Sequence, residues 1–187
     1  MGTGGVFISG GDEMKTVLAG MALAAALAAP AAAKVTDQGP GGFTVALEGD
    51  ISMTPDYAFA RFVDIGSWWS DGHSFSGSAR NMTITPQPGG CWCETLPNSG
   101  FVEHMRVVFA DPGKMLVLKG GMGPLVFMGA TGALTIKFEH KDEGTHVTLT
   151  FAVGGYDPGG WGDLSKAVDG VLAEQLGYYV ANKARNP

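Results

Sequence analysis

The feature that most constrains the fold is one long helical stripe at the carboxyl end, preceded by a series of strand-like segments. A period of about 3.6 predicts a helix over residues 161–184. Its stripe contains Leu164, Val168, Val171, Gln175 and either Tyr178 or Tyr179. One helix can cover an antiparallel sheet only where the sheet curls around it, and this arrangement usually leaves space between helix and sheet. The sequence therefore predicts an α+β protein with room for a ligand between its layers.

Seven strands are expected in this curved sheet. The first covers residues 43–48, after a polar linker at residues 34–42. Two short helices should follow it, one beginning at Thr54 and Pro55 and one near residues 65–69. The other six strands are expected at residues 81–85, 91–96, 101–110, 115–119, 131–140 and 145–153. Together these elements form one domain over residues 43–184.

The amino-terminal segment has the pattern of a secretory signal peptide. Lys15 precedes an apolar, alanine-rich run, and Ala31 and Ala33 occupy the small-residue positions of a cleavage site. Pro30 interrupts the run, which is marginal in length and hydrophobicity for a spanning helix. We therefore expect residues 14–33 to be removed and residues 1–13 to be a non-native extension. The mature protein should be periplasmic or secreted, without stable membrane insertion.

Charge and length narrow the classes of partner. The net charge is −6, and the 12 Lys and Arg residues form no basic run that would neutralise a row of phosphates. Nucleic acid is therefore not expected as a partner. A chain of 187 residues with 45% hydrophobic content suits one domain with a substantial core. Oligomeric state has no signal in the sequence.

Several segments together resemble the START-like, helix-grip superfamily called SRPBCC. They are Trp68-Trp69, "PQPGGCWCE" at 86–94, "VEHMRVVFADPGKMLVL" at 102–118, "GTHVTLTF" at 144–151 and "VDGVLAEQL" at 168–176. The likeness covers residues 43–184 and is greatest to polyketide cyclase/dehydrase-like proteins and homologues of the heat-shock chaperone ATPase activator. Chaperone activation does not suit an exported protein. The resemblance implies a hydrophobic cavity between the long helix and the sheet, and it names no catalytic residue.

A hydrophobic or aromatic small molecule, lipid-like or polyketide-like, is accordingly the expected partner, and no cofactor is expected. The residues that we expect to line the cavity are large apolar side chains of the helix, the strands and their loops. They are Trp68, Trp69, Trp92, Met105, Met115, Phe127, Met128, Leu172 and Tyr179. In the alternative interpretation the same side chains fill the core and leave no cavity.

The two cysteines of the chain, Cys91 and Cys93, lie on either side of Trp92. If Leu96 pairs with Phe101 across a tight turn, the register of the hairpin follows by counting. That register predicts one face with Cys91, Cys93, Val102, His104 and Arg106. The opposite face would carry Trp92, Glu94, Leu96, Phe101, Glu103 and Met105.

Four interpretations of the cysteines stay open. Half-buried thiols packed in the sheet are favoured. A disulfide is disfavoured by geometry, because residues two apart in a strand lie about 6.6 Å apart at Cα. A zinc site would use Cys91, Cys93 and His104, with His73 as a fourth ligand. A cysteine nucleophile would need activation by His104 or Arg106.

The predicted register also places Glu94 opposite Glu103. If their face lines the cavity, burial and like charge would raise the pKa of one carboxyl group and produce an acid–base pair. Such a pair would suit a cyclase, dehydratase or isomerase. The alternative is that both glutamates are solvated or paired with arginine.

Overall fold

A computed structural model describes residues 1–2 and 34–182. The expected signal peptide at residues 14–33 lies outside the described residues, as does most of the expected extension at residues 1–13. Within the described part of the chain, no helix is both long and apolar enough to cross a membrane.

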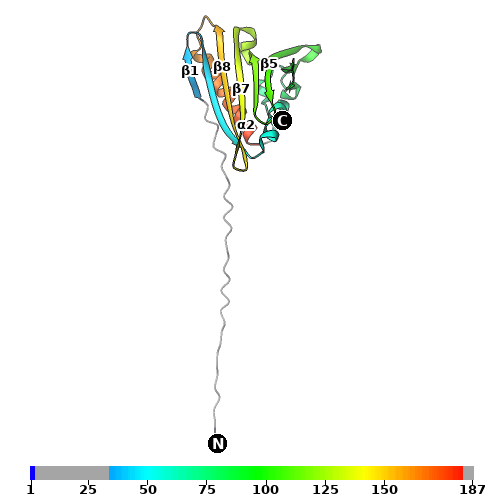
Figure 1. The fold of residues 1–187 in the computed structure, drawn as a ribbon, viewed down its shortest axis with the longest axis vertical. Helices are drawn as coiled ribbons and strands as arrows, with labels where there is room; N and C mark the ends of the chain where they lie inside the picture. The colour runs from blue at the N-terminus through cyan, green and yellow to red at the C-terminus, as the bar shows by residue number, and fades with distance from the viewer. Residues whose placement is uncertain (3–33, 183–187) are drawn as a thin grey trace.

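Residues 34–182 form one open antiparallel sheet of eight strands, in the order β1-β2-β8-β7-β6-β5-β4-β3. In Figure 1 the long helix α2 lies behind this curved sheet. The strands are β1 Lys34–Gly39, β2 Gly42–Ile51, β3 Met82–Ile84, β4 Cys91–Thr95, β5 Phe101–Asp111, β6 Met115–Gly120, β7 Gly129–Lys141 and β8 Gly144–Tyr156. The α-helices are α1 Pro55–Val63 and α2 Gly162–Val180. The 3-10 helices are η1 Ile65–Ser67, η2 Asp71–His73, η3 Ala79–Asn81, η4 Pro97–Ser99 and η5 Gly123–Phe127.

The predicted α+β architecture, with an antiparallel sheet and a carboxyl-terminal helix, is confirmed, but the prediction of seven strands was wrong. The additional strand, β1, occupies Lys34–Gly39 and pairs with β2. The sequence predicted a linker there because β1 is an edge strand whose side chains are mostly exposed. It therefore lacks the apolar alternation by which strands are recognised, and its backbone hydrogen bonds to β2 hold it in the sheet.

The two short helices predicted after the first strand follow β2, the second strand of the structure, and are of different types. The first is α1, which begins at Pro55, as the sequence predicted. The second is the single-turn 3-10 helix η1. Two further 3-10 turns, η2 and η3, follow it in the loop that leads to β3. This loop contributes to the site described below.

The helix α2 is anchored at both ends. At its start, Trp161 packs against Phe43 with ring centroids 5.7 Å apart and donates its indole N–H to the carbonyl of Pro40. Near its end, Tyr179 is completely buried and donates its hydroxyl to the carbonyl of Ala58 at 2.8 Å. The Tyr179 ring also packs edge-on against Trp68, at 5.2 Å. The space between helix and sheet is therefore filled around Tyr179.

Candidate functional site

A cavity of about 400 Å³ lies beside the first half of α2. It is bounded by that helix, by the loop containing η2, by η5 and by the sheet. Its lining consists of Trp69, Gly72, His73, Ser74, Phe75, Met82, Trp92, His104, Met122, Gly123, Pro124, Phe127, Leu164, Ala167, Val168, Val171 and Leu172. Pockets of 300–1,000 Å³ with mostly apolar walls and a few polar groups are typical of small-molecule sites.

The lining overlaps in part with the residues predicted for it. Trp69, Trp92, Phe127 and Leu172 line the cavity. The other predicted residues lie elsewhere in the described structure: Trp68, Met105 and Tyr179 are buried in the core, and Met115 and Met128 are only partly buried. Periodicity identified the buried face of α2. It did not show which turns of the helix lie beside the cavity and which are packed in the core.

The loop containing η2 supplies lining residues that the sequence analysis missed, Phe75 among them. Phe75 meets the predicted Phe127 edge-to-face, with ring centroids 5.7 Å apart, and both are exposed. His73 also lines the cavity, and its Nε2 lies 3.2 Å from a carboxylate oxygen of Glu174 on α2. The aromatic and histidine content of the two loops was the available signal. Their position over the helix could not be derived from it.

A bulge in the β4–β5 pairing determines which side chains face inward. Cys91 pairs with Arg106 and Trp92 with Met105, as predicted. After an irregularity beyond Trp92, Cys93 pairs with Glu103 instead of His104. As a result the consecutive residues His104 and Met105 are both buried, which regular alternation does not permit.

Gly120 of β6 permits close packing at this bulge. It pairs with Met105 and has φ of 149°. A Cβ atom at this position would lie 2.6 Å from the carbonyl oxygen of His104 and 2.8 Å from Cα of Met105. A side chain is therefore excluded where β6 passes the bulge.

The predicted register that placed Glu94 opposite Glu103 was wrong. The bulge moves Glu103 to the opposite face, where it accepts a hydrogen bond from Arg106 at 2.8 Å. Glu94 stays inside, with 1% of its surface exposed, and pairs with His104 at 3.0 Å. One carboxylate and one imidazole therefore occupy the buried face in place of two carboxylates.

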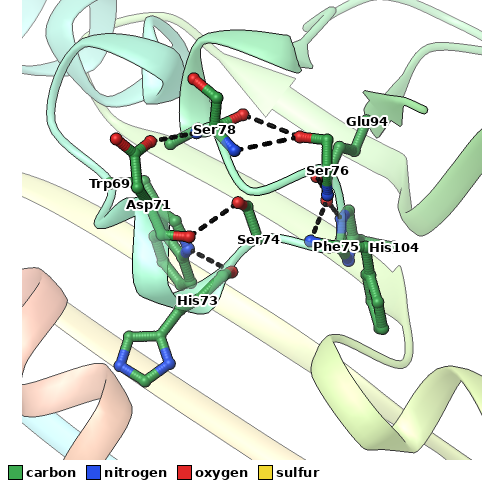
Figure 2. A network of polar contacts seen from close by, with 10 residues as sticks. Trp69, Asp71, His73, Ser74, Phe75, Ser76, Ser78, Glu94 and His104 are labelled. Carbon is green, nitrogen blue, oxygen red and sulfur yellow. Dashed lines mark hydrogen bonds and ion pairs between the residues drawn. The ribbon is translucent and has the colours of Figure 1, made fainter. Parts of the chain in front are cut away.

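Glu94 is held by hydrogen bonds from the η2–η3 loop as well as from His104. Its carboxylate accepts the backbone N–H of Ser76 at 2.5 Å and that of Phe75 at 3.2 Å (Figure 2). Burial by itself would raise the pKa of Glu94, but the hydrogen bonds from Ser76, Phe75 and His104 outweigh burial and hold this pKa below its ordinary value. Glu94 is therefore a buried carboxylate anion.

The loop that holds Glu94 is bonded to α2 and is also braced by hydrogen bonds of its own. The backbone N–H of Ser70 donates to Gln175 of α2 at 2.8 Å, whereas within the loop the indole of Trp69 donates to the carbonyl of His73 at 2.9 Å. The backbone N–H of Ala79 donates to Asp71 at 2.6 Å. In Figure 2 the His73 ring extends toward α2, whereas Glu94 and His104 lie at the other end of the loop. The loop thus connects the helix to the buried pair.

His104 is a neutral imidazole with one nitrogen committed to Glu94. Burial lowers its pKa, and the hydrogen bond and charge of Glu94 offset this effect only in part. Since a carboxylate can only accept, the proton of the neutral ring is assigned to Nε2, which donates to Glu94. Nδ1 then carries a lone pair, and within the described structure it has no hydrogen-bond partner.

The pKa of His104 leads to a prediction about acid stability. Folding lowers this pKa below its unfolded-state value of 6.5. The contribution of His104 to the free energy of unfolding is therefore complete above pH 6.5, and it is lost as pH falls through the folded-state pKa. Urea unfolding at about pH 7.5 and about pH 5.5 should show a larger loss of stability for the wild type than for His104→Phe. Equal losses in the two proteins would contradict a lowered pKa.

Cys91 and Cys93 form a disulfide, so the favoured interpretation of two free thiols was wrong. Their Cα atoms are 5.4 Å apart, closer than the roughly 6.6 Å of a regular strand, and the irregular pairing begins between them. The proposed zinc ligands do not converge, since the sulfurs bond to each other and His104 bonds to Glu94. Among the described residues, no group of three or more His, Cys, Asp or Glu side chains is arranged to hold a metal ion.

Comparison with known proteins shows likeness at the level of fold. No family model and no curated protein matches the chain. A putative uncharacterized protein from Rhizobium leguminosarum is 13% identical with a TM-score of 0.52, covering 82% of this chain and 99% of its own. The Mll3558 protein from Rhizobium loti is 18% identical with a TM-score of 0.52, covering 73% and 95%. The solution structure of CalU16 from Micromonospora echinospora is 11% identical with a TM-score of 0.51, covering 86% and 81%. A sheet with a carboxyl-terminal helix, compatible with a helix-grip fold, is common to them.

Proposed function

We propose that this chain is an exported helix-grip protein of the SRPBCC superfamily that binds a compact aromatic molecule in the cavity beside α2. The observation that carries the proposal is an apolar space of about 400 Å³ next to a helix that is packed tightly at its far end. Apolar surface contributes about 25 cal/mol for each Å² removed from water. A ligand of two fused rings would bury enough surface there to bind.

The walls favour an aromatic ligand over a flexible chain. Trp69, Phe75, Trp92 and Phe127 all line the cavity. Trp69 and Trp92 are already arranged edge-on, with ring centroids 4.8 Å apart. Aromatic pairs of this kind contribute about 0.5–1.5 kcal/mol beyond the area they bury. A flat ring system can form such contacts with several walls at once.

The disulfide supports the proposed location. Bonds between cysteines persist in oxidising compartments and are rare in the reducing cytosol. The Cys91–Cys93 bond therefore suits a periplasmic or secreted protein, as the signal-peptide pattern predicts.

An enzymatic role is a second candidate because His104 provides a neutral base in the cavity wall. A cyclase, dehydratase or isomerase would use it to remove a proton from the ligand. Glu94 and Glu103, the pair predicted from the sequence, lie on opposite faces, so this candidate role uses His104 instead. Exchange of a bound aromatic ketone's α-protons in heavy water, abolished in His104→Phe, would support this second role.

Blocking the cavity tests the proposed binding. Ala167 is a small residue of α2 that lines it, and Ala167→Trp places an indole at the same wall. We expect saturable binding of 2-methoxynaphthalene to the full chain and a loss of about tenfold or more in affinity in Ala167→Trp, measured by fluorescence titration.

The matched control is Lys166→Trp. The neighbouring Lys166 side chain is 78% exposed and lies outside the lining, so this variant should bind like the wild type. Absence of saturable binding to the wild type, or equal binding by all three proteins, would overturn the proposed function.

A further inference from the structure

The geometry points to a hydroxyl-recognition site inside this cavity: we infer that the bound aromatic molecule is a phenol or enol whose O–H donates to Nδ1 of His104. The inference rests on the proposed function and specifies the chemical class of the ligand. His104 is the binding residue, and Glu94 is a positioning residue that acts through it.

The first observation is an unsatisfied acceptor in the cavity wall. His104 is 3% exposed, and its Nδ1 is buried without a hydrogen-bond partner among the described residues. Leaving a buried polar atom unpaired is unfavourable, so such atoms are rare in folded proteins. A ligand that donates a hydrogen bond to Nδ1 would remove this cost.

The second observation is that the acceptor is fixed in place. The His104 ring is held at Nε2 by Glu94, and Glu94 is held by the backbone N–H groups of Phe75 and Ser76. The ring of Phe75 stacks on His104 with an interplanar angle of 23° and centroids 5.7 Å apart. The ring that carries Nδ1 is therefore already fixed and does not have to be ordered on binding.

A second unpaired atom in the wall has the complementary chemistry. Trp92 lines the cavity, and its indole N–H is buried without a partner in the described structure. Its ring centroid lies 5.5 Å from that of His104. A hydroxyl group both donates and accepts, so it matches this pair of an acceptor and a donor. An ether or ketone could only accept.

The charge of the site disfavours an anionic ligand. Glu94 is a carboxylate directly behind His104, and the neutral imidazole does not compensate its charge. The other titratable side chain of the lining, His73, is paired with Glu174 at 3.2 Å. The buried negative charge of Glu94 would thus repel a carboxylate ligand, whereas it would not repel a neutral phenol.

Three compounds that share the naphthalene ring system test the inference. Their binding to the full chain is measured by calorimetry at about pH 7.5, where His104 is neutral. They are 2-naphthol, its methyl ether 2-methoxynaphthalene, and 2-naphthoate. We expect 2-naphthol to bind about tenfold more tightly than the ether, because only the naphthol donates a hydrogen bond. The naphthoate should bind more weakly than the naphthol.

His104→Phe identifies the acceptor, because it removes the nitrogen but keeps an aromatic ring beside Phe75. The tenfold preference for 2-naphthol should fall to about one in this variant, while the affinity for the ether stays within about twofold of wild type. The ether thus reports whether the cavity itself is intact. Glu94→Gln should reduce the preference without abolishing ether binding, and ¹⁵N NMR of the imidazole should then show loss of the fixed Nε2–H tautomer.

The outcomes separate the two proposals. If none of the three naphthalenes binds the wild type, the proposed function is wrong. If 2-naphthol and the ether bind equally well, or if His104→Phe keeps the preference, the cavity binds aromatics but recognition by His104 is wrong.

Discussion

Replacing Glu94 by alanine should lower the free energy of unfolding by about 3–5 kcal/mol, because the change breaks a buried charged network. The backbone N–H groups of Ser76 and Phe75 and the ring N–H of His104 would all lose their acceptor. Buried donors without partners retain their full cost of desolvation. Urea unfolding of the full chain at about pH 7.5 measures the loss.

Glu103→Ala is the matched control, since Glu103 is the neighbour that sequence counting placed beside Glu94. In the structure it lies on the other face, in an ion pair with the exposed Arg106. Pairs of this kind contribute about 0–1 kcal/mol. Losses of similar size in the two variants would contradict the bulge and the buried histidine–glutamate pair.

Replacing Tyr179 by alanine should cost a similar amount, about 3–5 kcal/mol, for a different reason. Tyr179 has no exposed surface, contacts the rings of Phe62 and Trp68, and donates its hydroxyl to Ala58. Its removal would leave a void in the closely packed end of the space between helix and sheet. Chemical unfolding measures the loss, and Tyr179→Phe, which removes only the hydroxyl, should cost about 1 kcal/mol.

The adjacent Tyr178 supplies the control for Tyr179. It is 45% exposed and contacts Glu174 at the surface, so Tyr178→Ala should stay within about 0.5 kcal/mol of wild type. A small loss in Tyr179→Ala would mean that the space is open along the whole of α2. The distinction between a filled end and a hollow end of the helix would then be wrong.

The order of strands and helices was largely predictable because each element has many residues that repeat its period. The helix expected over residues 161–184 is α2 at Gly162–Val180, and β2 to β8 each overlap an expected strand. The exception, β1, is held by backbone pairing with β2, and backbone hydrogen bonds leave no mark on side-chain pattern. The periodicity of side chains therefore could not predict β1.

Counting along the hairpin predicted Glu94 opposite Glu103, whereas in the structure the buried partner of Glu94 is His104. Near the turn the pairing is shifted by one, since Thr95 rather than Leu96 pairs with Phe101. The bulge cancels the shift, so Trp92 and Met105 pair as counted. Between these points the β5 side chains change face while those of β4 keep theirs, so His104 rather than Glu103 lies on the buried face with Glu94. A bulge of one residue is not visible in the composition of a strand.

The cavity depends on the volume left between α2 and the elements that face it, and the sequence does not give this volume. Leu172 and Tyr179 belong to the same stripe of α2, yet Leu172 lines the open space and Tyr179 fills the core. The difference arises from what faces each turn of the helix. Trp68 and Phe62 occupy the space at Tyr179, while the loops containing η2 and η5 enclose the space at Leu172.

Crystals of the full chain grown with 6-bromo-2-naphthol, measured at the bromine absorption edge, test the central claim most directly. A single strong anomalous peak should lie in the cavity between the first half of α2 and the sheet, with the phenol oxygen about 2.7–3.0 Å from Nδ1 of His104. An empty cavity, or bromine found only on the outer surface, would contradict ligand binding beside α2. A ligand inside the cavity with its hydroxyl directed away from His104 would contradict the recognition assigned to that residue.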